Sequence, residues 1–156
     1  MKHIIQIALI LSSPLLFAGN TTPESISKEY LKNEMNRMPI VRKMRAAETP
    51  KEKAEYKAEL QKVWDFSNHF IDKERVQRNS SQAYHMGHFA NSVRTWAEEN
   101  GMNYQKLLVR TKVKEKTDDY VSIVLFVEHN QCMLEFYNIE GNWKITKEQC
   151  VYKHKR

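Results

Sequence analysis

The chain of 156 residues contains only two cysteines, four glycines and four prolines. It contains no Gly-x-Ser-x-Gly elbow, no His-Glu-x-x-His and no Cys-x-x-Cys, so no nucleophile elbow and no common zinc site is indicated. Lysine and arginine exceed aspartate and glutamate by 25 to 19. Without an arginine-rich groove motif, this excess does not indicate nucleic-acid binding. We therefore predict a protein that is not an enzyme, with no cofactor.

The first 20 residues have the three parts of an export signal. Residues 1–3 carry a positive charge at Lys2, residues 4–17 are mostly apolar and residues 18–20 are small or polar. The apolar run is shorter than the ~20 residues of a membrane-spanning helix. We predict that 1–18 is a cleavable signal peptide and that 19–156 is a single domain in the periplasm or outside the cell. An uncleaved anchor or a buried N-terminal helix is the alternative.

The two cysteines, Cys132 and Cys150, lie in the last quarter of the chain. An even number of cysteines in an oxidising compartment favours a disulfide bond. We therefore predict that these two are bonded. In a cytosolic chain the same residues would instead be buried thiols.

The expected register of the last two strands limits how that disulfide bond can form. A two-residue turn at 140–141 pairs Phe136 with Ile145, which suits the apolar pattern. The same register places Cys132 opposite Gln149, so its partner cysteine would point to the other face of the sheet. The disulfide therefore requires a bulge, or an early end to the last strand.

Three helices are predicted in the first two thirds of the chain. The first has Thr22 as its N-cap and Pro23 at its first position, and Pro39 is expected to end or kink it. A capping box at 49–52 starts the second helix, which reaches about Arg75. Ser80 or Ser81 starts the third helix, and Asn100-Gly101 ends it. The apolar stripe of the first helix comprises Ile26, Tyr30, Leu31, Met35 and Met38; that of the second comprises Tyr56, Leu60, Val63, Trp64, Phe70 and Ile71.

Beyond residue 106 the apolar period changes from helical to alternating, which is typical of strands. Residues 107–114 alternate, and 120–127 are nearly all apolar, as in a central strand buried on both faces. Residues 132–137 and a segment from Trp143 form two more strands. Turns are expected at 117–119, 129–130 and 140–141. The predicted fold is α+β, with three N-terminal helices packed on a four-stranded antiparallel β-meander.

This element order, closed by the hairpin segment Tyr-Asn-Ile-Glu-Gly-Asn-Trp-Lys-Ile at 137–145, resembles the NTF2-like or cystatin-like superfamily. The resemblance covers most of residues 50–150 and implies a sheet that wraps the helices into a cone. The superfamily includes enzymes, carriers and binding modules, so it does not imply a function. Its catalytic members typically place an Asp–His or Tyr–Asp pair inside the cone, and no residue of this chain matches such a motif.

The third predicted helix is apolar on two sides. One stripe contains Ala83, Met86, Ala90, Val93 and Ala97, with Gly87 allowing close approach of a neighbour; the other contains His85, Phe89, Ser92 and Trp96. A helix of this kind is either deeply buried or turns one side to a pocket or a partner. Core packing explains both stripes. Alternatively, His85, Phe89 and Trp96 line a ligand cavity or an interaction surface, and they are our candidate binding residues.

Histidines could hold a metal at one place. His85 and His88 are neighbours at i, i+3 on a helix, and His69 is the only obvious third ligand. Two histidines on a partly exposed helix face explain the pattern without a metal, and we predict none. Asp65 and His69, at i, i+4, could form an acid–base pair, but a surface ion pair is the simpler interpretation.

A small exported domain with one disulfide and no recognisable active site usually acts through its surface. We therefore expect a non-enzymatic protein-binding module of the periplasm, such as an immunity protein or inhibitor that neutralises a toxin or effector. A carrier of a small ligand or metal that uses the cone interior is the first alternative. A minor component of a secretion or adhesion machine is the second.

Overall fold

The computed structural model describes residues 21–79 and 85–151. The predicted signal peptide and the predicted helix start at 80–81 lie outside these residues. Within them, the helices are α1 (Pro23–Ala46), α2 (Pro50–Phe70), α3 (Lys73–Asn79), α4 (Met86–Glu99) and the short 3-10 helix η1 (Tyr104–Lys106). The strands are β1 (Val109–Lys116), β2 (Tyr120–Val127), β3 (Asn130–Ile139) and β4 (Asn142–Val151).

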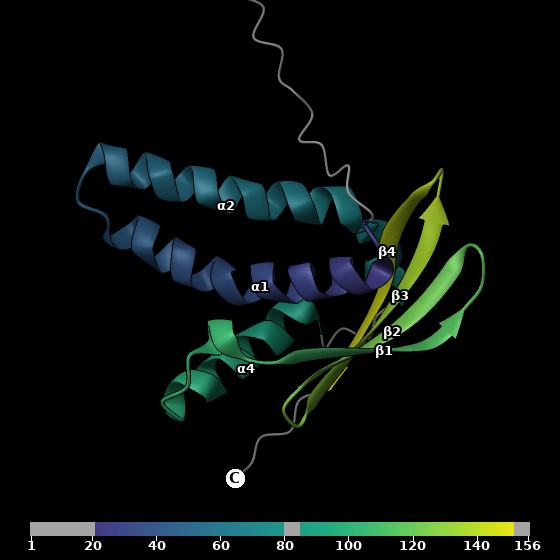
Figure 1. Cartoon of the computed structure of the whole chain (residues 1–156). Helices are drawn as coiled ribbons and strands as arrows, with labels where there is room; N and C mark the ends of the chain where they lie inside the picture. Colours follow the sequence, from purple (N-terminus) through teal and green to yellow (C-terminus); the bar gives the residue numbers. More distant parts are fainter. Residues whose placement is uncertain (1–20, 80–84, 152–156) are drawn as a thin grey trace, which may run out of the picture.

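The strands form one antiparallel sheet in chain order, β1-β2-β3-β4, which confirms the predicted α+β meander. The α1–α2 hairpin runs away from one side of the sheet, and α4 lies on that same side (Figure 1). The described residues contain four α-helices rather than the predicted three. None of these helices is long and apolar enough to cross a membrane.

Helix α1 starts where predicted but does not end at its proline. The Thr22 hydroxyl accepts a hydrogen bond from the Ser25 N–H at 3.2 Å, and the helix then continues through Pro39 to its last residue, Ala46. An interior proline costs a helix about 3 kcal/mol. The turns beyond it are held by packing, because Ile40 forms a second apolar cluster with Leu60 and Val63 of α2.

The second predicted helix is two helices. The Thr49–Glu52 capping box is present, but α2 ends at Phe70 and α3 begins at Lys73. Between them Ile71 forms a parallel bridge with Ile145 of β4, and the Asp72 N–H donates to the Ile145 carbonyl at 2.9 Å. The chain leaves the helix here because Ile71 pairs with the edge of the sheet.

Helix α4 begins after His85, which is its N-cap, and it ends at the predicted Asn100-Gly101 stop. Gly101 has a φ of 69°. Its N–H donates to the Glu98 carbonyl at 3.1 Å, and the Met102 N–H donates to the Ala97 carbonyl at 2.8 Å. These two bonds form a Schellman motif, which satisfies the last carbonyls of the helix.

Among the residues that the structure describes, helices cover only one face of the sheet (Figure 1). Val121, Ile123, Leu125 and Val127 of β2 are at most 2% exposed, whereas Val124 and Phe126 on the other face are half-buried. The expectation that β2 is buried on both faces therefore holds fully for one face only. The β2–β3 turn falls at 128–129, one residue before its predicted place.

The last hairpin contains a bulge, the first of the two predicted ways in which the disulfide can form. Glu140 and Gly141 both have positive φ, 52° and 82°, as a two-residue hairpin turn needs. Phe136 pairs with Ile145, but Glu135 pairs with Lys147, so β4 has one extra residue at this point. The register beyond it brings Cys132 opposite Cys150, and the two form the predicted disulfide.

Candidate functional site

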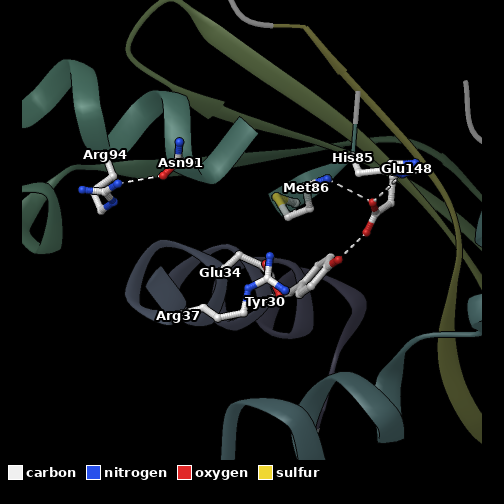
Figure 2. A network of polar contacts seen from close by, with 8 residues as sticks. All are labelled: Tyr30, Glu34, Arg37, His85, Met86, Asn91, Arg94 and Glu148. Atoms are coloured by element: carbon white, nitrogen blue, oxygen red, sulfur yellow. Dashed lines mark hydrogen bonds and ion pairs between the residues drawn. The ribbon is translucent and has the colours of Figure 1, made fainter. Parts of the chain in front are cut away.

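A cleft of about 950 Å³ lies between the helices and β4. Its walls come from α1, α2, α3, the first turns of α4, and β4. Most of the residues that line it are polar or charged, and its floor contains the buried side chains of Tyr30, Glu34 and Glu148. Figure 2 shows these side chains with the neighbouring groups of α1 and α4.

Glu148 connects three elements at the floor of the cleft. The Tyr30 hydroxyl of α1 donates to Glu148 Oε1 at 2.5 Å, and the Met86 N–H at the start of α4 donates to Oε2 at 3.0 Å. His85 Nδ1 lies 3.6 Å from Oε2 (Figure 2). A carboxylate at this position accepts a hydrogen bond from an N–H group that has no partner within α4. Its negative charge also interacts favourably with the positive N-terminal end of the α4 dipole.

The bulge in β4 is what turns Glu148 towards the cleft. Successive side chains of a strand alternate between its two faces. Without the extra residue at Thr146, Glu148 and Cys150 would point to the outer face of the sheet. With it, both are on the inner face and at most 2% exposed.

Tyr30 is held as a hydrogen-bond donor. Burial raises the pKa of its hydroxyl well above the ordinary value, and the nearby Glu148 and Glu34 carboxylates raise it further. A phenol next to two carboxylates keeps its proton because a phenolate would add a third negative charge. Tyr30 therefore keeps its proton and can donate it to Glu148.

A second carboxylate, Glu34, is buried one turn further along α1. It forms an ion pair with Arg37, with Oε2 3.1 Å from Nη2. A Cβ atom at Gly87 of α4 would lie 3.0 Å from Arg37 Nη2 and 3.3 Å from Glu34 Oε2. Gly87 therefore lets α4 approach this pair closely, as predicted. Burial raises the pKa of Glu34; the Arg37 guanidinium opposes this shift and the Glu148 carboxylate adds to it.

We expect Glu34→Gln to become more stable relative to the wild type as the pH rises. An acid whose pKa is raised in the folded state stabilises the fold below its ordinary pKa, 4.5 for Glu34. That contribution is lost as the pH rises through the higher folded-state value. Urea unfolding of both proteins between about pH 4 and pH 7 measures the difference. Glu29→Gln, at an exposed position of α1, is the control; a difference for Glu34→Gln that is independent of pH would contradict the expectation.

Arg94 of α4 is buried beside the cleft, with 2% of its surface exposed. Its guanidinium donates to Glu98 at 2.6 Å. It also donates to Asn91 Oδ1 at 2.7 Å (Figure 2). Because Asn91 lines the cleft, Arg94 fixes the orientation of a cleft amide without lining the cleft itself.

The mouth of the cleft has two exposed apolar side chains. Trp64 of α2 is 46% exposed and Met38 of α1 is 37% exposed, and both line the cleft. Lys73 of α3 also lines it and donates to Asn68 Oδ1 at 2.6 Å. The cleft thus has a carboxylate floor and a mouth where large apolar groups are open to solvent.

The structure separates the three predicted binding residues. His85 lines the cleft. Phe89 is fully buried and belongs to the main core, so it is not available to a ligand. Trp96 is half-buried and does not line the cleft. The other stripe of this helix, from Met86 to Ala97, is buried as predicted for its described members, and Ala83 lies outside the described residues.

The candidate metal ligands do not converge. His85 and His88 both line the cleft, whereas His69 does not. No group of three or more histidine, cysteine or acidic side chains within residues 21–79 and 85–151 is arranged to hold a metal ion. The His69 ring packs edge-on against Phe70, and its pKa is lowered by partial burial and by the charge of Lys144.

The chain matches no protein-family model, no curated protein and no solved structure. The resemblance to the NTF2-like superfamily therefore stays a prediction.

Proposed function

We propose that this protein is an exported, non-enzymatic binding module that holds part of another protein in the cleft. The observation that carries this proposal is Trp64, which is 46% exposed at the cleft mouth. Tryptophan is enriched among the residues that contribute most to protein–protein binding. A large aromatic side chain left open beside a concave surface is a suitable anchor for a partner.

The floor of the cleft supports binding rather than catalysis. Each oxygen of Glu148 accepts a hydrogen bond from the chain itself, from Tyr30 and from Met86. A general acid or base must instead be within reach of the proton that it transfers to or from a substrate. Glu148 is placed to hold α1, α4 and β4 together beneath the cleft.

An immunity protein or inhibitor that neutralises a toxin or effector is the role that this proposal favours. It rests on the small size of the chain, its predicted export signal and its disulfide, which suits an oxidising compartment. A carrier of a small ligand is the second candidate, because a volume of about 950 Å³ lies within the range of small-molecule sites.

Trp64→Ala is expected to weaken partner binding by about 2 kcal/mol or more, roughly thirty-fold in Kd. Stability should change by less than about 1 kcal/mol, since the side chain is half in solvent. The partner is captured from the exported fraction of producing cells and of their competitors, then purified and titrated calorimetrically. Tyr137→Ala is the control, because Tyr137 is 39% exposed and does not line the cleft.

Two results would count against the proposal. Equal binding by Trp64→Ala and the wild type would place the partner elsewhere on the molecule. Saturable binding of a compound from a small-molecule library, lost in Trp64→Ala while no protein partner binds, would favour the carrier.

A further inference from the structure

The two edges of the sheet differ. The β4 edge is contacted by the segment between α2 and α3, because Ile71 forms a bridge with Ile145. At the opposite edge, β1 pairs only with β2, and no other strand in the described part of the chain lies against it (Figure 1). An edge strand presents a row of backbone N–H and C=O groups to which a further strand can pair.

The β1 edge is strongly basic. Arg110, Lys112, Lys114 and Lys116 are all exposed, and Glu115 is the one acidic residue of the strand. None of the four cations takes part in an ion pair within residues 21–79 and 85–151. Their charges are therefore open to an incoming group.

The regular part of this edge is residues 109–113, because a bulge follows between Val113 and Glu115. Arg110 pairs with Phe126 and Lys112 pairs with Val124, so both cations lie on the uncovered face of the sheet. Val109 and Thr111 alternate with them and are half-buried. A strand added at this edge would have Arg110 and Lys112 beside it on the uncovered face of the sheet. On the other face it would lie beside Val109 and Thr111, at the margin of the apolar core.

We propose that the β1 edge binds an extended acidic segment of another protein by strand addition, at a surface distinct from the cleft. Opposite charges directly across a strand pair are favourable and like charges are unfavourable. A second copy of β1 would bring cations against cations, whereas a segment with alternating acidic and apolar residues complements both faces. This site does not depend on the function proposed for the cleft.

The probe is a fluorescent ten-residue peptide that alternates glutamate with valine or threonine. We expect saturable binding, measured by anisotropy, that weakens as salt rises from about 50 to 500 mM. Hydrogen exchange of the 109–113 amides should slow in the complex. A peptide of equal charge with proline at alternate apolar positions cannot donate from those positions, and it should bind at least ten-fold more weakly.

The variant Arg110→Glu with Lys112→Glu should lose at least ten-fold in affinity for the acidic peptide. The variant Lys53→Glu with Lys57→Glu has the same net charge and changes exposed residues of α2; it should bind nearly as the wild type does. Equal loss in both variants, equal binding of the proline peptide, or unchanged exchange in β1 would overturn the proposal. A further result would also overturn the proposal: the wild type binds no peptide, and the double variant Arg110→Gln with Lys112→Gln self-associates. In that case the cations of β1 would serve only to prevent two copies of the chain from pairing through this edge.

Discussion

Replacing Glu148 with alanine is expected to lower the free energy of unfolding by about 3–5 kcal/mol. The substitution leaves two buried donors, the Tyr30 hydroxyl and the Met86 N–H, without their acceptor, and each such group costs about 1–3 kcal/mol. The space left by a side chain that is 2% exposed adds to the loss. Urea unfolding of the variant and the wild type at pH 7 measures the change.

Glu148→Gln separates the shape of this side chain from its charge. An amide keeps one acceptor oxygen in almost the same volume, so the loss should be nearer 1–2 kcal/mol. Tyr30→Phe removes the other end of the 2.5 Å bond, and its effect should not add to that of Glu148→Ala, since the two side chains share one contact. Strict additivity, or an alanine variant as stable as the wild type, would show that Glu148 does not join α1 to β4.

The elements that sequence predicted best are those whose ends are fixed by local chemistry. The Thr49 capping box and the Gly101 stop depend on residues within one helical turn, and both were found from sequence. The break at Ile71 could not be found in this way, because it depends on Ile145, which is far along the chain. Likewise, Pro39 stays inside α1 because of packing on α2, which no local pattern reports.

The candidate site was predicted only in part. His85 was identified, but Glu34 and Trp64 were not, although both left a signal. Glu34 follows Tyr30 by four residues, so a carboxylate lies in the apolar stripe of α1. Trp64 lies about 100° around α2 from Val63, beside the buried stripe rather than within it. A tryptophan at that position is a candidate for an exposed side chain. Assigning Trp64 to the apolar stripe of the helix predicted instead that it is buried.

The position of Glu148 on the inner face of the sheet could be predicted from the strand register, but its hydrogen-bond partners could not. The requirement that Cys132 meet Cys150 already demanded a bulge or an early end to the last strand, and the structure has the bulge, with Thr146 as the extra residue. Two residues before Cys150, Glu148 must then share the inner face of the sheet with it. Sequence could have placed this carboxylate inside; it could not have supplied its partners on α1 and α4, because these depend on how the helices pack.

Removing the disulfide is expected to cost about 3 kcal/mol of stability. The bonded cysteines are 18 residues apart, and closing a loop of this size removes about that much chain entropy from the unfolded state. The effect should extend to the cleft, because the bond holds the register that turns Glu148 inward. In the double variant Cys132→Ser with Cys150→Ser, the Met86 amide should therefore exchange its hydrogen faster than can be explained by the global loss of stability.

Reductant provides the matched control for this last prediction. It should destabilise the wild type to about the level of the double variant and leave the double variant itself unchanged, since no bond remains to be broken. Urea unfolding with and without reductant gives the stability change, and native-state hydrogen exchange gives the local one. If the variant loses about 3 kcal/mol while Met86 keeps its relative protection, the bulge at Thr146 and the packing of Ile145 fix the register without help from the bond. If neither quantity changes, the disulfide contributes to neither the fold nor the cleft.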